Sequence, residues 1–227
     1  MDYKVFISKL KSKANPTNVE GMKRFGIQGN KMLGVSVTNI RKIAHGIRDH
    51  ELALDLWDTG IHEARIMAGI VDDPKQITLT QMDEWVNDFD SWDVCDQVCT
   101  ILVDVSPLAN ELIFEWAASE KEFVRRAAFA TIAGMAVHKK VMKDEKFEPY
   151  LDLIKKYSDD DRNFVKKAVN WALRNIGKRN VPLCKRAIEV ASQMEQMDSR
   201  SARWIARDAF RELTQKLAEN RIGKMKD

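Results

Sequence analysis

The sequence of 227 residues lacks the features that mark secreted and membrane proteins. It has only three cysteines, an odd number that cannot form a complete disulfide framework and that suits a reducing compartment. No apolar run approaches the roughly 18 residues that a membrane-spanning helix needs. The first residues, MDYKVFISKLKSKANP, contain neither the apolar core nor the cleavage site of a signal peptide. We therefore expect a soluble, cytoplasmic protein with no membrane partner.

Motifs of metal and nucleotide chemistry are also missing. Cys95 and Cys99 lie four residues apart on one predicted helix, but the four histidines are scattered and no Cys-x-x-Cys or His-Glu-x-x-His motif is present. No glycine-rich phosphate loop follows a strand-like segment. The sequence therefore predicts no metal site and no cofactor.

Glycine and proline are scarce as well, with ten and five residues, and β-type alternation of apolar residues is absent. Apolar residues instead recur at three-and-four spacing, which is typical of amphipathic helices, and all five prolines fall in the first turns or between helical segments. The connections are short, so we expect an all-α chain forming a single domain over 1–227. The predicted helices cover 2–13, 17–26, 36–48, 50–58, 62–72, 78–88, 92–105, 108–118, 121–137, 148–157, 161–178, 181–196 and 200–219.

Three of these helices share a sequence pattern. The segments 123–132, 164–173 and 204–213 align, and their starts lie 41 and 40 residues apart. This spacing falls in the period of about 40–47 residues that HEAT and armadillo repeats show. Such repeats stack into an α-α superhelix, or solenoid, with a concave surface. The alternative is a large helical bundle whose helices resemble one another by chance.

The charge is unevenly distributed along the chain. Residues 1–120 carry 12 lysines and arginines against 19 aspartates and glutamates, a balance of −7, whereas residues 121–227 carry 25 against 15, a balance of +10. A basic half favours a polyanionic partner. Together with the repeats, it predicts a concave basic groove.

A stripe of polar and aromatic residues runs opposite the predicted core face of the repeats. With each repeat start as position zero, offsets 0, 1, 4, 5 and 9 are apolar in the segments that start at Phe123 and Phe164, and offsets −1, +3 and +7 share roughly the opposite flank. Taken singly, a tryptophan there fits a core position, an arginine or lysine fits a solvated face, and an aspartate fits a surface acid. Together they form a surface able to stack on, steer and polarise a ligand. With a weaker copy of the repeat that begins at Asp93 included, the stripe contains Trp92, Asp96, Arg126, Lys167, Trp171, Arg207 and Arg211.

These residues resemble a known family. The segment Ser91–Val98, SWDVCDQV, is similar to the tryptophan–aspartate motif of the HEAT-like-repeat DNA glycosylases of the AlkD type. Phe123–Ala128 and Asn163–Arg174 resemble the next two repeat motifs, and Leu33–Lys42 resembles the entry to the first repeats. The motifs occur in the family's order and span nearly the whole chain.

The resemblance implies a monomeric DNA repair enzyme that cleaves the N-glycosidic bond of N3- or N7-alkylated purines in double-stranded DNA. It implies a monofunctional reaction without a covalent protein intermediate, and a base that need not be swung into a protein pocket. Trp92, Asp96 and Trp171 are the implied catalytic residues. The implied DNA contacts are Arg126, with its neighbour Arg125 as the alternative, and Lys167, Arg174, Arg207 and Arg211.

The residue types suit this chemistry. A cationic alkylpurine is already a good leaving group, so the enzyme mainly stabilises the positive charge that develops on the sugar, which an ionised Asp96 can do while it orients a water molecule. The faces of Trp92 and Trp171 attract cations, and basic side chains hold phosphates without choosing a sequence. Two alternatives remain open: a non-catalytic DNA-binding repeat protein, and a protein-binding scaffold.

Overall fold

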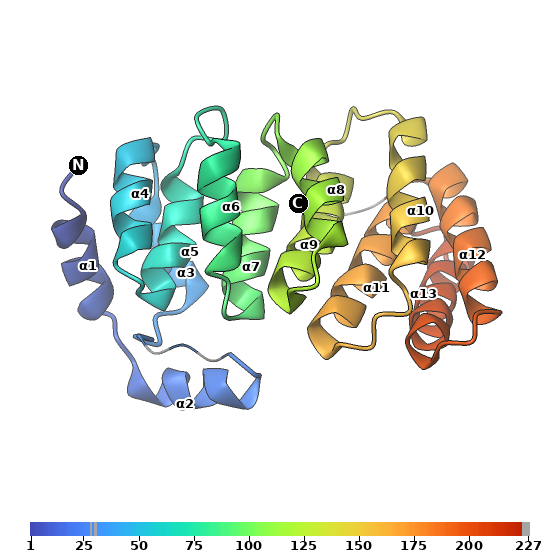
Figure 1. The fold of residues 1–227 in the computed structure, drawn as a ribbon, viewed down its shortest axis with the longest axis horizontal. Coiled ribbons are helices and arrows are strands. Elements are labelled where there is room, and N and C mark those ends of the chain that lie inside the picture. Colours follow the sequence, from blue (N-terminus) through green and yellow to red (C-terminus); the bar gives the residue numbers. More distant parts are fainter. Residues whose placement is uncertain (28, 30, 224–227) are drawn as a thin grey trace. The chain divides into compact units, whose positions relative to one another are not determined.

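The computed structural model describes residues 1–27, 29 and 31–223 of the chain (Figure 1). These residues form thirteen α-helices, one π-helical segment and one 3-10 turn, and no strand occurs among them. Each predicted helix is present. Apart from the helix predicted over 92–105, the helix ends agree within four residues. The all-α fold class is thereby confirmed. None of the described helices combines the length and apolar character that crossing a bilayer requires.

The chain divides into two compact units, Met1–Asn110 and Glu111–Asp227. Unit 1 is built around α5, which packs against α3, α4 and α7 and is buried along most of its length. The helices of unit 1 are α1 (Tyr3–Lys11), α2 (Pro16–Arg24), α3 (Val37–Ala44), α4 (His50–Asp58), α5 (His62–Val71), α6 (Leu79–Asn87) and α7 (Trp92–Val98), followed by the π-helical segment η1 (Cys99–Val103).

Local sequence explains where several of these helices begin. Asn15 caps α2 by accepting from the amides of Thr17 and Asn18, and Pro16 occupies the first helical position, where its missing N–H costs nothing. Thr78 and Gln81 form a reciprocal capping box at the start of α6. These side chains satisfy backbone donors that the first turn leaves without partners.

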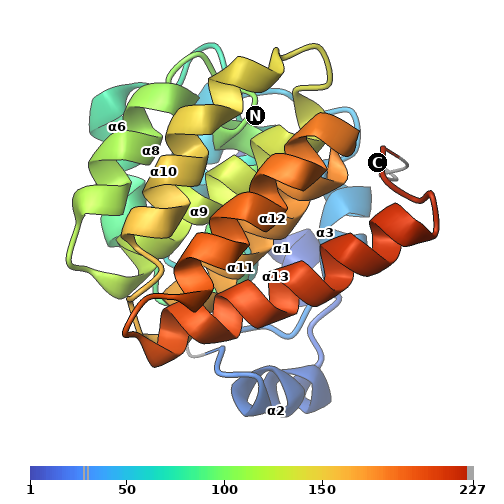
Figure 2. The ribbon, with the colours of Figure 1, turned by 90° about the vertical axis from the view of Figure 1, so that its right-hand side faces the viewer.

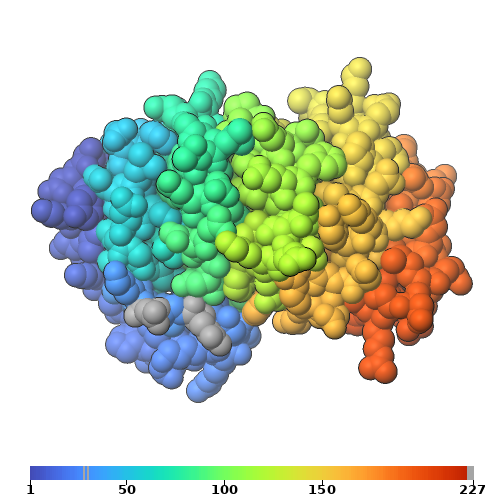
Figure 3. All heavy atoms as spheres, in the orientation of Figure 1, coloured from blue at the N-terminus to red at the C-terminus, as the bar shows by residue number. Residues whose placement is uncertain are grey.

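Helix α2 differs from the rest of unit 1. It has no buried residue, and it lies across the lower ends of the neighbouring helices in the view of Figure 1. In the space-filling view it forms a lobe on the lower edge of unit 1 (Figure 3). Polar contacts hold α2 and its end in place. The side-chain amide of Asn18 donates to the carbonyl oxygen of Gly34, and the indole N–H of Trp92 donates to the carbonyl oxygen of Phe25.

Unit 2 consists of helix pairs in which the second helices stack on one another. Helix α11 packs against α9 on one side and against α13 on the other, and α12 runs beside α13 (Figure 2). The helices are α8 (Ala109–Ala118), α9 (Glu122–His138), α10 (Glu148–Lys156), α11 (Asn163–Lys178), α12 (Val181–Glu195) and α13 (Arg200–Ala218), with the 3-10 turn η2 (Asp144–Phe147) before α10.

Contacts between successive repeats follow the period seen in the sequence. The rings of Phe123 and Phe164 lie 5.3 Å apart, and the amide of Asn175 donates to the carbonyl oxygen of Ala133 at 3.1 Å. These pairs are 41 and 42 residues apart. The sequence repeat is therefore a structural repeat, and α9, α11 and α13 are its equivalent helices.

The predicted apolar face is correct at most of its positions and wrong at Trp204. Ala127, Ala168 and Leu213, at offsets 4 and 9, are fully buried. Trp204, at offset 0 of α13, is 42% exposed, and its ring is covered on one side by the Lys166 ammonium, 5.1 Å from the ring centroid. Among the described helices, none lies beyond α13 in this series to cover the position.

Helix α7 does not continue unbroken to residue 105, as the sequence pattern suggested. At Cys99 it widens into η1, where the amide of Asp104 donates to the carbonyl of Cys99, five residues back. The hydroxyl of Thr100 also donates to the carbonyl of Asp96 at 2.7 Å. Such π-helical turns are rare and occur frequently at functional sites.

Candidate functional site

In unit 1, Trp92 and Asp96 lie one helical turn apart on the same side of α7. Trp92 is the first residue of the helix, and both side chains are partly exposed. The indole N–H of Trp92 donates to the carbonyl oxygen of Phe25 at 3.0 Å, which ties α7 to the end of α2. The structure thus brings a tryptophan and a carboxylate together at the surface of unit 1, as predicted for this pair.

A cleft of about 510 Å³ opens beside Trp92. It lies within unit 1 and draws its lining from α2, the segment before α3, and the first turns of α3, α5 and α7. The volume falls in the range of about 300–1,000 Å³ typical of small-molecule pockets. The lining residues are Thr17, Asn18, Gly21, Met22, Phe25, Ile27, Gly34, Val35, Ser36, Val37, His62, Ile66, Trp92 and Asp93.

A buried ion pair forms part of this lining. Nε2 of His62 lies 2.8 Å from a carboxylate oxygen of Asp93, and the two side chains are 3% and 13% exposed. Burial lowers the pKa of His62, but the hydrogen bond to Asp93 and the nearby carboxylates of Glu63 and Asp90 outweigh it, so the net pKa is raised. The imidazolium form of His62 is therefore favoured above its ordinary pKa.

In unit 2, Lys167 and Trp171 lie one turn apart on α11, on the same side of that helix. Lys167 is exposed and Trp171 is partly exposed. This agrees with the predicted flank at offsets +3 and +7. That Trp171 faces Trp92 and Asp96 across one concave basic groove stays a prediction, as does the single domain.

The other predicted cations of unit 2 are paired with acids. Arg174 lies 2.8 Å from Glu212, Arg207 lies 2.9 Å from Glu195, and Arg211 lies 2.7 Å from Asp208. The side chains of Arg207 and Arg211 are 72% and 78% exposed, whereas that of Arg174 is 30% exposed. Exposed pairs of this kind are worth about 0–1 kcal/mol, so a phosphate group can replace the acid at Arg207 and Arg211.

Arg126 does not lie on a solvated flank, contrary to its predicted position in the stripe. It is 6% exposed, and its guanidinium donates to the carbonyl oxygen of Phe164 at 2.6 Å. Helix α9 is followed by another repeat, and α11 covers the side of α9 that a single-helix projection shows as outer. Arg126 thus links two repeats, and its contact to DNA stays a prediction.

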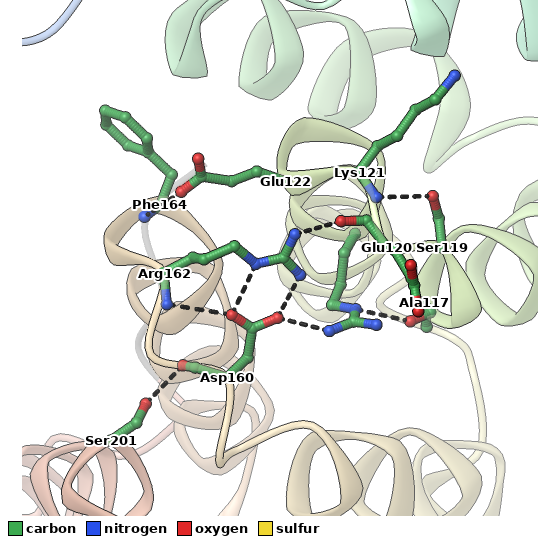
Figure 4. A network of polar contacts seen from close by, with 10 residues as sticks. Ala117, Ser119, Glu120, Lys121, Glu122, Asp160, Arg162, Phe164 and Ser201 are labelled. Atoms are coloured by element: carbon green, nitrogen blue, oxygen red, sulfur yellow. Dashed lines mark hydrogen bonds and ion pairs between the residues drawn. The ribbon is translucent and has the colours of Figure 1, made fainter.

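Its neighbour Arg125 also joins two repeats, through the carboxylate of Asp160. Figure 4 shows that carboxylate with Arg162 and Ser201. Arg125 donates to Asp160 at 2.6 Å, and Arg162 donates to both oxygens of the same carboxylate. The hydroxyl of Ser201 on α13 donates to the carbonyl of Asp160 at 2.7 Å. Burial alone would raise the pKa of Asp160. The hydrogen bonds from Arg162 and Arg125 lower this pKa by more than burial raises it, so the net pKa lies below the ordinary value.

We also looked at the side chains that could bind a metal ion. No group of three or more histidine, cysteine, aspartate or glutamate side chains is arranged there to hold a metal ion. Cys95, Cys99 and Cys184 are buried, and none of the three forms a disulfide.

Comparison with protein families decides the relationship. The family model described as DNA alkylation repair enzyme matches residues 6–213. The chain belongs to the DNA alkylation repair enzyme family. The matched range covers most of both units and contains Trp92, Asp96 and Trp171.

One solved structure shows the same fold over nearly the whole chain. A structure described as "a new family of proteins related to the HEAT-like repeat DNA glycosylases with affinity for branched DNA structures" is 22% identical, with a TM-score of 0.82 and coverage of 98% of this chain and 97% of that chain. A designed armadillo repeat protein, 17% identical, aligns with a TM-score of 0.36 over 78% of this chain and 92% of its own. No curated protein sequence matches the chain. The structure with the TM-score of 0.82 confirms the HEAT-like fold.

Three features of this alkylation repair family member were not predicted: the cleft, the His62–Asp93 pair and the π-helical turn. His62 and Asp93 are 31 residues apart, and a single sequence does not pair them. The cleft depends on where α2 lies, which no periodicity shows. Trp92, a predicted site residue that lines the cleft, marked this region in advance.

Proposed function

We propose that the chain is a monofunctional DNA glycosylase that hydrolyses the N-glycosidic bond of N3- or N7-alkylated purines in double-stranded DNA. The observation that carries the proposal is the placement of Trp92 and Asp96 on one exposed side of α7, in a member of the DNA alkylation repair enzyme family. A carboxylate beside an aromatic ring suits a reaction in which positive charge moves from base to sugar.

Asp96 is assigned the central role. Its carboxylate stabilises the developing oxocarbenium charge and orients the attacking water, while the cationic base leaves without a protein nucleophile. The N-glycosidic bond breaks, and the base leaves with the bonding electrons, which neutralise its positive charge. A new bond joins the sugar carbon to the water oxygen, and one proton of the water passes to solvent. Trp92, and Trp171 from unit 2, contact the cationic nucleotide or its sugar.

Unit 2 supplies the grip on DNA in this proposal. Lys167, Arg207 and Arg211 are exposed on α11 and α13, and their charges suit phosphate oxygens. Arg174 is available where the phosphate displaces Glu212. Arg126 takes part by holding α11 against α9 through the carbonyl oxygen of Phe164. A concave basic groove of this kind works as a monomer.

The direct test is release of base from methylated duplex DNA under single-turnover conditions. Wild-type chain is expected to release 7-methylguanine or 3-methyladenine, and Asp96→Asn is expected to slow release by roughly 10²–10⁴-fold. Asp55→Asn, a matched change at an exposed aspartate of α4, is expected to keep the wild-type rate. Absence of release by folded wild-type chain would end the glycosylase proposal.

A second candidate function is DNA binding without catalysis. It is favoured by the structural relative that is described as having affinity for branched DNA structures. Under this candidate, the chain binds a four-way junction or forked duplex in preference to linear duplex and releases no base. A protein-binding scaffold is the third candidate, and it is left if no DNA binds even at low salt.

A salt titration separates these candidates and tests the role of unit 2. Each phosphate contact that is lost is expected to reduce the slope of log affinity against log salt by about 0.9. Arg207→Ala and Arg211→Ala should each weaken binding at low salt, with stability unchanged within about 0.5 kcal/mol. Lys9→Ala, a change at an exposed lysine of α1 whose ammonium lies over Phe6, serves as the control.

A further inference from the structure

A groove of about 330 Å³ lies between α12 and α13 of unit 2, which run side by side (Figure 2). This volume falls in the range of about 300–1,000 Å³ typical of small-molecule pockets. Ala191 of α12 and Ala206 of α13 line it and are each 1% exposed. Because an alanine side chain is a single methyl group, the two helices leave a hollow above these residues. The other lining residues are Ser192, Glu195, Gln196, Arg207 and Phe210.

Phe210 gives the groove an aromatic wall. It lies one turn after Ala206 on the same side of α13, and it is 46% exposed. A phenylalanine at the surface keeps apolar area in contact with water, and a flat ring stacked on it would remove that area from water. The groove is therefore suited to a ligand with a flat ring.

Three arginines form a row along α13 next to this wall. Arg203, Arg207 and Arg211 follow one another at intervals of four residues, which places them on one side of the helix. Their partners Asp198, Glu195 and Asp208 lie 2.7–3.5 Å away. Ion pairs at the surface are weak, whereas a guanidinium binds a phosphate with two parallel hydrogen bonds, so phosphates can replace these acids. The row suits an extended anion that carries several phosphates.

The polar side chains of the groove are able to bond a ring at its edge. Gln196 carries both a donor and an acceptor in its side-chain amide. The hydroxyl of Ser192 donates to the carbonyl oxygen of Ile188 at 3.0 Å, and its oxygen is still able to accept. Every nucleobase has donors or acceptors on its edge, so these two side chains suit a base without selecting one kind.

The arginine row argues against a second copy of the chain as the occupant. A two-fold contact places the same surface on both sides, so the row of one copy would face the row of the other. Like charges at close range repel one another. An acidic partner without flat rings would satisfy the arginines but would leave the ring of Phe210 uncovered. Phosphates and rings together are the chemistry of a nucleic acid strand.

We propose that the groove binds one unpaired base of a single-stranded stretch of DNA. The base stacks on Phe210, and the phosphates beside it contact Arg207 and Arg211. The proposal rests on the DNA binding in the proposed function and goes beyond it, because a duplex keeps its bases stacked inside and offers none to a groove. Stacking on an aromatic side chain tolerates any base, so the site recognises the unpaired state of the strand and not its sequence.

The test is binding of a labelled single strand of mixed sequence to the full chain, measured by fluorescence anisotropy. Wild-type chain is expected to bind it, and Phe210→Ala is expected to weaken binding about 5- to 150-fold, the effect of losing one stacking partner. Phe210→Leu keeps an apolar wall without the ring and should also bind more weakly than wild type. Phe114→Ala, at a 41% exposed phenylalanine of α8 outside the groove, is the matched control and should bind as wild type.

A strand of abasic nucleotides separates stacking from a structural effect. This strand keeps the phosphates and lacks the bases, so wild-type chain should bind it more weakly than the normal strand. Phe210→Ala should bind the abasic strand as well as wild type does, because the two changes remove the same contact. If Phe210→Ala weakens binding of both strands by the same factor, the ring supports the fold and the base site is refuted.

A salt titration tests the two phosphate contacts. Arg207→Ala and Arg211→Ala should each reduce the slope of log affinity against log salt by about 0.7 on a single strand. Unchanged slopes in both variants would refute the assigned phosphate contacts. Failure of folded wild-type chain to bind the strand would refute the site as a whole. A dimer that Phe210→Ala converts to monomer, with no strand bound, would show that a second copy occupies the groove.

This site and the glycosylase function fail separately. A chain that binds the single strand through Phe210 but releases no base from methylated duplex refutes the glycosylase function alone. A chain that releases methylated bases, but whose binding of the strand does not depend on Phe210, refutes the single-strand site alone.

Discussion

The two units use buried polar side chains in different ways. In unit 1, Glu63 and His62 hold loops and helix starts around a cleft. In unit 2, Asp160 and its arginines join one repeat to the next. The difference indicates that unit 1 is organised around a ligand-sized space and unit 2 around the regular stacking of its helices. Changes to the buried network around Asp160 in unit 2 should therefore affect stability more than changes to the buried contacts of unit 1.

The largest expected effect comes from removing the carboxylate that joins the repeats of unit 2. Asp160→Ala leaves Arg125 and Arg162 without their shared partner, and the Asp160 side chain is 5% exposed. We expect a loss of about 3–5 kcal/mol in the free energy of unfolding, measured by urea denaturation. A loss below about 1 kcal/mol would contradict the role given to this network.

A smaller effect is expected where the unit 1 cleft meets the chain between α2 and α3. Gly34 has φ of +75°, and a Cβ atom there would lie 2.1 Å from the carbonyl oxygen of Asn15. Gly34→Ala should cost about 1–3 kcal/mol of stability. Gly21→Ala is the matched control, since nothing lies within 4 Å of its added Cβ and alanine favours the helix by about 0.5–1 kcal/mol. Equal effects of the two changes would show that the backbone at Gly34 is not constrained.

The smallest effect is a pH dependence that should distinguish the units. The pKa of His62 is raised, so its contribution to stability is fully present below its ordinary pKa of 6.5 and is lost as pH rises through the folded-state value. The pKa of Asp160 is lowered, so its contribution is present above its ordinary value of 3.8 and is lost as pH falls.

Urea denaturation of wild-type chain and of His62→Gln across these ranges tests this assignment. The decline above pH 6.5 should disappear in His62→Gln, while the decline at acid pH should stay. If the alkaline decline persists in the variant, another group is responsible for it.

The sequence predicted the helices well because their causes are local. Apolar spacing, the Asn15–Pro16 start of α2 and the Thr78 capping box lie within a few residues of the elements they define. The pairing of Trp92 with Asp96 and of Lys167 with Trp171 followed from helical geometry alone. The repeat period also predicted which helices stack.

The rest depended on contacts between distant segments. A helical projection shows Arg126 as outward, but it does not show that the next repeat covers it. It likewise does not show that Arg174 meets Glu212, 38 residues later, or that His62 meets Asp93. Whether Trp92, Asp96 and Trp171 converge also depends on how distant segments are placed, so their convergence stays a prediction.

The π-helical turn at Cys99–Val103 has a consequence for how α7 tolerates change. A turn of this kind accommodates one residue more than the α-helix around it, and each α-helical residue rotates the chain by about 100°. Removing one residue between Cys99 and Val103 would close the turn into ordinary helix and leave the residues on either side facing as they do now. Removing one between Trp92 and Asp96 would instead rotate the two side chains out of alignment. A single-residue deletion scan along α7 would thus separate the stretch that can be shortened from the stretch that cannot.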